Sequence, residues 1–395
     1  MHNTTIKRSD IMQKLKYLDG FRGLAALIVV LSHFIVAFYP ALYNGDINQV
    51  HTGNAVEIVI AKNPINLLYN GNFAVCIFFI LSGYVLSYKY FMTKNSEYLV
   101  SGAVKRYFRL LAPVIASVSI VFLLMKLSLF YNKEASSLSL SNWWLGIFWN
   151  FDTSYIDVAK NIFFGVFFKY DDKYNTVLWT MTYELFGSFL VFGFLALFGR
   201  VKNRFLFYMI IIILLFNTYY LGFILGMLLS DLKNNGYFDN RIFKQFSLKI
   251  FFIGIGVLFG SYPTGTTVDN SVYRFFEATN FTTIVIYHII GAFFIMVVLL
   301  NSTKLQYILS KPFFEFLGKI SFSMYLLHVI IIGSFTSYMF IKLVNYLSYS
   351  TSFIISFIAS LPLMLIGSYL IYKYVDKNGI KIANYLYNRI FKQAD

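Results

Sequence analysis

Cysteine and charge are both scarce in this sequence, and each scarcity excludes a class of protein. The single cysteine, Cys76, cannot form an intramolecular disulfide or supply a multi-cysteine metal site. Asp, Glu, Lys and Arg make up only 13% of the 395 residues, whereas soluble domains average about 25%. A disulfide-stapled fold is therefore excluded, an ordinary soluble domain is not expected, and we predict no metal site.

Apolar residues are correspondingly abundant, at 58% of the chain, and aromatic residues reach 20%. Lipid-facing Phe and interfacial Tyr account for such a composition, because an amphipathic ring is stable at headgroup depth. The formal net charge is +15, which in a soluble protein would suggest nucleic-acid binding. Here the Lys and Arg residues cluster between apolar runs, as they do in cytoplasmic loops. We therefore predict a lipid bilayer as the partner and no nucleic acid.

Ten apolar runs approach the ~20 residues that cross the hydrocarbon layer of a bilayer. The seven long runs are 21–43, 72–90, 110–131, 178–199, 283–302, 321–343 and 353–375, and the three shorter runs are 205–216, 218–232 and 250–262. The sequence thus predicts an all-α integral membrane protein with a cytoplasmic N-terminal segment (1–20), a transmembrane domain (21–375) and a cytoplasmic tail (376–395). The stretch 132–177 contains three tryptophans and is predicted to be interfacial or re-entrant.

The basic residues favour ten spans with both termini in the cytoplasm. In that arrangement 25 of the 33 Lys and Arg residues fall on the side of the termini, and six fall in the opposite segments. This asymmetry is the positive-inside pattern, and it holds at every loop. Merging 205–232 into one helix would place the later basic loops outside, so we prefer ten spans.

Arg22 and His33 are the most informative ionisable residues, because a charge at the centre of a span costs about 2.5–3.5 kcal/mol. Their separation of 11 residues returns to nearly the same helix face, with the arginine at the cytoplasmic mouth and the imidazole near mid-bilayer. Asp19 lies one turn before Arg22 and can orient its guanidinium. A simpler interpretation makes Arg22 a positive-inside anchor and His33 a helix–helix hydrogen bond.

Three further sites along the chain extend this set of polar residues. Ser82 and Gly83 form a small polar notch in the second span, which allows a helix or a ligand to approach the backbone. Arg106 and Arg109 share a helical face at the cytoplasmic start of the third span, which suits phosphate oxygens unless the charges serve topology alone. Glu184 is predicted a turn or two below the outer surface, where a carboxylate must be paired, protonated or hydrated.

The order of these pieces along the chain resembles the membrane-bound acyltransferase 3 family. The resemblance runs from about residue 16 to 375 and rests on five motifs. They are Arg22 with His33, Phe78-Phe79-x-Leu81-Ser82-Gly83-Tyr84, Arg106-x-x-Arg109 with Pro113, Leu178-Trp179-Thr180-x-x-x-Glu184, and Leu317-Gly318-x-x-Ser321-x-Ser323-x-Tyr325-Leu326-x-His328. One departure is visible, because Leu185 stands where many members carry a second acidic residue.

The resemblance implies a membrane O-acyltransferase that takes acetyl from cytoplasmic acetyl-CoA, or another acyl group from its CoA ester. The implied acceptor is a hydroxyl of a cell-surface polysaccharide, lipopolysaccharide or lipid-linked sugar, and the implied location is the bacterial cytoplasmic membrane. Carried over residue by residue, the resemblance makes His33 and Glu184 catalytic. His33 would act as a base or as a transiently acylated group, and Glu184 as a carboxylate nearer the outer face. Arg22, Arg106 and Arg109 would bind the donor, and Asp19, Ser82, Gly83, Tyr325 and His328 would line the substrate path or serve structure.

A proton- or ion-coupled transporter is the alternative from another class. His33, Glu184 and His328 would then form a relay, which explains the buried ionisable groups equally well. That relay does not require the inner arginines. A non-catalytic scaffold with the same helices would also be compatible with the spans, but it predicts no CoA binding.

Overall fold

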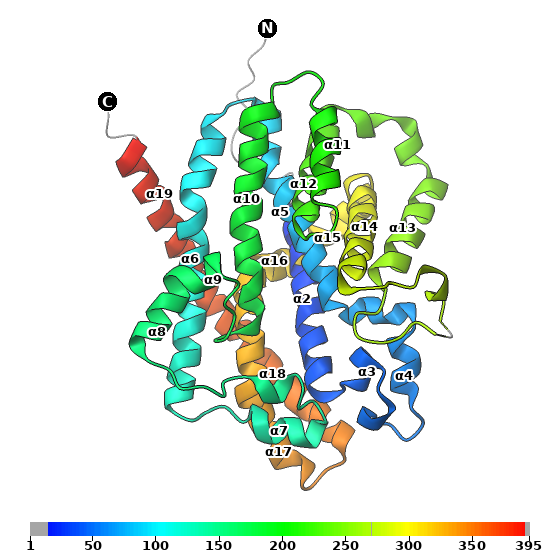
Figure 1. Ribbon diagram of the computed structural model, residues 1–395, viewed down its shortest axis with the longest axis vertical. Coiled ribbons are helices and arrows are strands. Elements are labelled where there is room, and N and C mark those ends of the chain that lie inside the picture. Colours follow the sequence, from blue (N-terminus) through cyan, green and yellow to red (C-terminus); the bar gives the residue numbers. More distant parts are fainter. Residues whose placement is uncertain (1–14, 270, 392–395) are drawn as a thin grey trace.

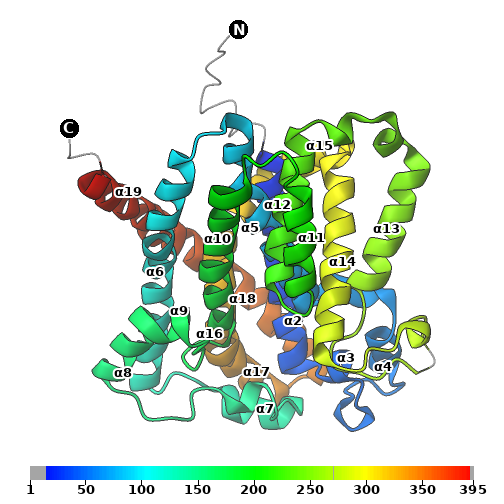
Figure 2. The same ribbon diagram turned by 45° about the horizontal axis from the view of Figure 1, so that its top comes forward.

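The computed structural model describes residues 15–269 and 271–391, and these residues form helices and loops without a β-strand (Figure 1). The long helices run between the same two ends of one bundle (Figures 1 and 2). They are α2 (Lys16–Phe38), α5 (Gly71–Thr93), α6 (Glu97–Lys126), α10 (Trp179–Phe198), α14 (Phe281–Leu300), α16 (Pro312–Ile331) and α18 (Tyr349–Ile371). We call the end at which α2 begins the upper end, as it is drawn in Figure 1.

Two of these helices continue beyond a π-helical turn. The turn η9 (Ile332–Thr336) joins α16 to α17 (Ser337–Val344), and η10 (Tyr372–Asp376) joins α18 to α19 (Lys377–Phe391). The predicted tail beyond residue 375 is thus helical as far as Phe391. Each π turn holds one extra residue per turn, which redirects the side chains around it.

Seven helical stretches are long and apolar enough to cross a membrane, and they correspond to the seven long runs of the sequence. The three shorter runs correspond to α11 (Phe205–Leu214), α12 (Tyr220–Asn234) and α13 (Phe246–Gly260). At 1.5 Å per residue these reach only about 15–22 Å, less than the ~30 Å of hydrocarbon. The chain is therefore a multi-pass α-helical membrane protein, whereas the count of ten and the cytoplasmic termini stay predictions.

The tightest contact that bears on the site joins α2 to α16 at two glycines. A Cβ atom added to Gly23 would lie 2.6 Å from the backbone nitrogen of Gly318, and one added to Gly318 would lie 2.3 Å from the carbonyl oxygen of Asp19. Only hydrogen fits at such separations, so the two backbones meet directly. Ten residues further along each helix, His33 meets His328 at the same sequence offset of 295. The two helices therefore run parallel in one register.

A second backbone contact fixes α5 against α12. A Cβ atom on Gly83 would lie 2.0 Å from the carbonyl oxygen of Phe223, and one on Gly226 would lie 2.0 Å from that of Ile80. The predicted notch of Ser82 and Gly83 therefore serves two purposes, because Gly83 admits a helix while Ser82 faces elsewhere. Small residues allow this approach in membranes, where van der Waals packing drives association.

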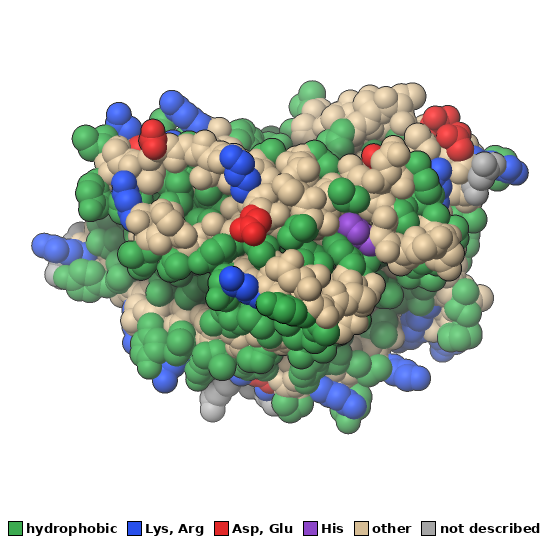
Figure 3. All heavy atoms as spheres, turned by 90° about the horizontal axis from the view of Figure 1, so that it is seen from below, with side chains coloured by type: hydrophobic (Ala, Val, Ile, Leu, Met, Phe, Trp, Pro, Cys, Tyr) green, Lys and Arg blue, Asp and Glu red, His purple; other side chains and the backbone are tan. Residues whose placement is uncertain are grey.

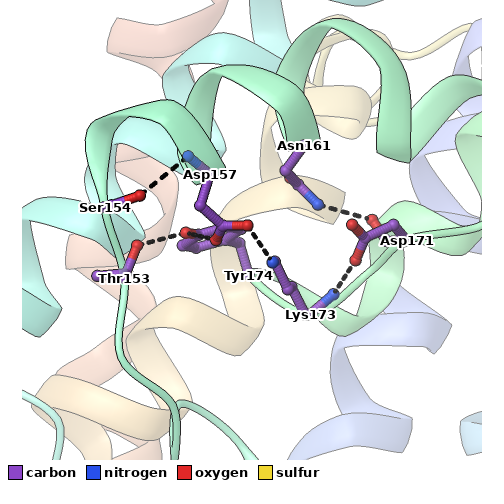
Figure 4. A network of polar contacts seen from close by, with 7 residues as sticks. All are labelled: Thr153, Ser154, Asp157, Asn161, Asp171, Lys173 and Tyr174. Carbon is purple, nitrogen blue, oxygen red and sulfur yellow. Dashed lines mark hydrogen bonds and ion pairs between the residues drawn. The ribbon is translucent and has the colours of Figure 1, made fainter.

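The segment between α6 and α10 folds over the lower end of the bundle as short helices: α7 (Asn132–Ser139), α8 (Tyr155–Lys160), η4 (Asn161–Gly165) and α9 (Val166–Phe168). Figure 4 shows the polar network that holds its second half together. The Asp157 carboxylate accepts hydrogen bonds of 2.6 Å from Lys173 and from the Tyr174 hydroxyl. Burial alone would raise the pKa of Asp157, but these two bonds hold it below its usual range.

Figure 3 views the lower end of the bundle from below. Hydrophobic side chains and uncharged polar atoms cover most of this face, and lysine and arginine side chains lie mainly toward its edge. Tyr155 and Ile156 are among the exposed apolar residues of the segment, and its interfacial or re-entrant location stays a prediction.

The glycine contact between α2 and α16 is testable by one methyl group. Gly318→Ala should lower stability by about 1–3 kcal/mol, because the new Cβ atom forces the helices apart. A lower midpoint of thermal unfolding in detergent would show this. Gly254→Ala is the matched control, since a Cβ atom there meets nothing within 4 Å. Equal midpoints for the two variants would contradict the close contact.

Candidate functional site

A cavity of about 710 Å³ opens among α2, α5, α6, α10, α16 and η10, within the usual range for small-molecule sites. Its polar lining comprises Lys16, Asp19, Arg22, Ser82, Arg106, Arg109, Thr180, Glu184, Glu315, Lys319, Ser321, Tyr325, Tyr372 and Asp376. Valine, leucine and phenylalanine side chains line the part between these groups. The exposed fraction of the side chain falls from 43% at Lys16 to 31% at Arg22 and 10% at Arg106. The cavity therefore opens at the upper end and deepens toward Arg106.

The cationic side chains nearest the mouth of the cavity are each paired with a carboxylate. Arg22 donates to Asp19 at 3.0 Å, one turn earlier on α2, as the sequence predicted. Lys16 and Lys319 both contact Glu315, at 3.3 and 2.9 Å, and so join the first turns of α2 and α16. These three residues were not singled out from the sequence. Their only signal there was their place at the starts of two predicted spans, where basic residues are common.

Arg106 and Glu184 form a buried ion pair in the depth of the cavity. The Ser82 hydroxyl donates to a Glu184 carboxylate oxygen at 2.8 Å, so the notch on α5 completes this cluster. The Nε atom of Arg106 is buried and has no hydrogen-bond partner among the described residues. That orphaned donor is available to an oxygen atom of a ligand in the cavity.

The predicted separation of Glu184 from the arginines is therefore wrong. The reason is the start of α6, which begins at Glu97 rather than near residue 110. Arg106 consequently lies nine residues, or about 14 Å, along a continuous helix. At that depth it meets Glu184, which is the sixth residue of α10.

Arg109 lines the same cavity and is exposed. No carboxylate lies within ion-pair distance of it among the described residues. Asp376 lines the cavity as well, from the π-helical turn η10, and supplies a negative charge on the facing wall. Such turns are frequent at functional sites, where they re-aim side chains. Asp376 was also missed, because the predicted tail began at that residue.

His33 and His328 form a hydrogen-bonded pair, with 2.6 Å between Nδ1 of His33 and Nε2 of His328. Nδ1 of His328 lies 3.1 Å from the Met324 carbonyl oxygen, which can only accept. Nδ1 of His328 therefore carries its proton, and in a neutral ring Nε2 must accept from Nδ1–H of His33. This leaves Nε2 of His33 with a lone pair and no partner among the described residues.

The two histidines lie at matching positions along their helices. α2 begins at Lys16 and α16 at Pro312, so both rings are 16–17 residues, or about 24–26 Å, from the starts of their helices. The position of His33 near mid-bilayer stays a prediction.

The histidine pair lies beyond the cavity rather than in its wall. Tyr325 lines the cavity, and the centroid of its ring is 6.0 Å from that of His328. Phe78 packs edge-on against Tyr325, with 5.8 Å between ring centroids. The Tyr325 hydroxyl is held by the Thr180 hydroxyl at 3.0 Å. One layer of aromatic rings therefore separates the cavity from His33.

The remaining two described histidines have structural contacts. His288 is buried and bonds the side chain of Asn72 and the carbonyl of Tyr262, both at 2.8 Å. His51 stacks on Tyr349 and reaches the Ser139 carbonyl oxygen at 3.0 Å. Neither residue lines the cavity.

The fold and the site together define a multi-pass membrane protein with a cation-lined cavity leading toward a histidine pair. Residues 15–373 match the acyltransferase 3 family, whose model is described as an acyltransferase domain. The chain belongs to this family and is a membrane acyltransferase.

Three fungal proteins of low identity are similar over most of their length. O-acetyltransferase PaAT-1 of Phomopsis amygdali is 23% identical, over 98% of this chain and 88% of its own. Acyltransferase clz18 of Cochliobolus lunatus is 24% identical, over 81% and 83% respectively. Acyltransferase R4 of a Phoma species is 23% identical, over 94% and 95%. No solved structure matches.

The two α6 arginines should behave differently on removal. Arg106→Ala leaves the Glu184 carboxylate buried without its counter-ion, which should cost about 3–5 kcal/mol of stability. Arg109→Ala breaks no ion pair seen among the described residues and should change stability by less than about 0.5 kcal/mol. Thermal unfolding of both purified variants measures this difference. Equal losses would argue against the Arg106–Glu184 pair.

Proposed function

We propose that this protein is an O-acyltransferase that moves an acetyl group from acetyl-CoA to a hydroxyl group. The observation that carries the proposal is the arrangement along α2, where a cation-lined cavity leads toward a histidine whose Nε2 lone pair is free. A thioester donor with phosphates at one end and a reactive carbonyl at the other fits this arrangement, with its phosphates at the cations and its carbonyl toward the histidine.

The donor phosphates would lie against Arg22 and Arg109, with Arg106 offering its orphaned Nε–H. Guanidinium groups bind phosphate oxygens by charge-assisted hydrogen bonds. Lys16 and Lys319 at the mouth attract the same charge. The apolar lining, with Phe79 and Leu86, then suits the extended arm of the donor. The acyl end would reach the layer of Tyr325 and Phe78.

His33 would act as the general base. Its Nε2 atom takes the proton of the acceptor hydroxyl while that oxygen attacks the thioester carbonyl carbon. The carbon–sulfur bond breaks, and the CoA thiolate leaves and recovers a proton. Nδ1–H of His33 stays bonded to Nε2 of His328 throughout, so His328 holds the ring orientation, as the orienting member of a catalytic triad does.

Glu184 has a different role from the one inferred from the sequence. Because it is bonded to Arg106 and Ser82, we propose that it positions the arginine rather than contacting the acceptor. Two carboxylates, Asp19 and Glu315, act on Arg22 and the two lysines in the same way. The cavity thus holds its cations in fixed positions before the donor arrives.

The acceptor would approach His33 from the lower end, because the donor occupies the upper side. We propose a hydroxyl of a lipid-linked sugar or a surface glycan, in keeping with the family resemblance. The bacterial cytoplasmic membrane stays a prediction, and the three similar proteins are fungal. The transporter alternative has no support of its own, since the family and the names of the relatives favour an enzyme.

Loss of the base should abolish transfer while donor binding remains. His33→Ala should lower the rate of acetyl transfer from labelled acetyl-CoA by about 10²–10⁴-fold, the usual contribution of general base catalysis. Equilibrium binding of acetyl-CoA to the same variant is the control and should be unchanged. Transfer at the wild-type rate would rule out His33 as the base.

The donor arginine makes a separate kinetic prediction. Arg109→Ala should raise KM for acetyl-CoA by about 10–100-fold with little change in kcat, since a charge-assisted hydrogen bond contributes about 1.5–3 kcal/mol. Arg200→Ala removes an exposed arginine outside the cavity and serves as the control. If the two variants share the wild-type KM, Arg109 does not contact the donor.

A further inference from the structure

Trp144 covers His33 from the segment that folds over the lower end of the bundle. Its indole lies nearly parallel to the imidazole, at 15°, with 5.2 Å between ring centroids. His328 stacks on the same imidazole at 4.9 Å and 21°. The reactive ring is therefore bounded by a helix residue and by a residue of the lower segment.

The loop that carries Trp144 is firmly attached. The Ser141 hydroxyl donates to the Val36 carbonyl of α2 at 2.7 Å, close to the end of the helix that bears His33. The Asn132 side chain donates to the carbonyls of Leu145 and Phe148, at 2.9 and 3.1 Å. Leu145, next to Trp144, is fully buried. The indole is thus held in place by its neighbours on both sides.

The Trp144 indole N–H is the exception within this well-bonded loop. It makes no hydrogen bond within the described residues, although the residue is only partly exposed. Trp143 and Trp149, by contrast, donate to Gln49 and to the Tyr174 carbonyl, at 3.1 and 2.8 Å. An indole combines an apolar face with one hydrogen-bond donor, so this N–H is available to an acceptor atom of a ligand.

The surroundings of Trp144 carry no charge along the chain. Between Glu134 and Asp152 the sequence contains no Asp, Glu, Lys or Arg residue. The cavity on the other side of Tyr325, in contrast, is lined by nine charged side chains. The two sides of the histidine pair therefore suit ligands of different chemistry.

We infer that Trp144 forms the acceptor subsite and shields His33 from bulk water. This inference rests on the proposed function. The acceptor is an uncharged alcohol with an apolar face, such as a neutral sugar ring or a hydrocarbon alcohol. The indole face packs against it, and the indole N–H donates to one of its oxygen atoms.

The shielding has a chemical consequence. If the indole is removed, water reaches Nε2 of His33 and takes the place of the acceptor hydroxyl. His33 removes one proton from the water molecule. The water oxygen then bonds to the acyl carbon, and the carbon–sulfur bond of the donor breaks. The CoA thiolate recovers the proton from His33, and the other product is acetic acid, which releases its proton to solvent as acetate. Loss of Trp144 thus converts a transferase into a hydrolase of its own donor.

The test measures release of free CoA thiol from acetyl-CoA by the purified full chain without any acceptor. Trp144→Ala should release CoA several-fold faster than the wild type. Trp144→Phe retains a stacking ring and should stay near the wild-type rate. Trp143→Ala is the matched control, because that ring packs on Tyr43 and not on His33. It should also stay near the wild-type rate.

The outcomes separate this inference from the proposed function. Unchanged CoA release by a folded Trp144→Ala variant that still binds acetyl-CoA overturns the inference alone. An equal rise in Trp143→Ala also overturns it, since the effect would then come from a disturbed loop. Release that persists after His33→Ala is added to Trp144→Ala counts against His33 as the base, and hence against the proposed function.

Discussion

The direct contact of α2 with α16 at Gly23 and Gly318 is the constraint on which the site depends. Because no side chain separates the backbones there, the two helices have one possible depth and one register. Each histidine follows the glycine of its own helix by ten residues. Ten is one heptad of seven plus three, so the histidines face the same interface between two parallel helices as the glycines do. The contact at that position is the pair of His33 and His328. A helix–helix packing requirement thus determines which nitrogen atom of His33 is left without a partner among the described residues.

Burial of charge is the second constraint, and it explains why the cavity contains so many carboxylates. An unpaired cation at this depth would cost several kcal/mol, and the ion pair of Arg106 with Glu184 reduces that cost. Asp19 does the same for Arg22 nearer the mouth. The lining carries five cations and four carboxylates, so its charge is nearly balanced before a ligand enters. Under the proposed function, selectivity for the anionic donor must then come from the directions of the hydrogen-bond donors rather than from net charge.

The histidine pair lies between two environments that differ in polarity. Toward the upper end is the charged cavity, closed by Tyr325 and Phe78. Toward the lower end is an uncharged aromatic loop, with Trp144 against His33. Under the proposed function this asymmetry lets a large anionic donor and a neutral acceptor meet at one nitrogen atom without sharing a binding site. It also requires the aromatic layer at Tyr325 to admit the acyl group.

The sequence by itself determined the class of the molecule, its family and a set of candidate site residues. Apolar runs specify helices in lipid irrespective of their neighbours, because every backbone group must be bonded within the span. The cost of a buried charge singled out Arg22, His33 and Glu184, and the order of the motifs gave the family. These conclusions depend on local composition and spacing alone, so they can be drawn from a single sequence.

Only the tertiary structure decided which of these residues meet. The helix that starts at Glu97 begins in polar sequence that hydropathy does not count, so the position of Arg106 relative to Glu184 was misjudged. Which polar side chains pair depends on which helices lie side by side. The neighbouring helices are determined by glycine contacts that are distant from the charged residues. The signal that Gly23 precedes His33 by ten residues, as Gly318 precedes His328, is visible only once the helices are known to touch. The sequence named the candidate site residues, and the packing of the helices, above all of α2 on α16, assigned their partners.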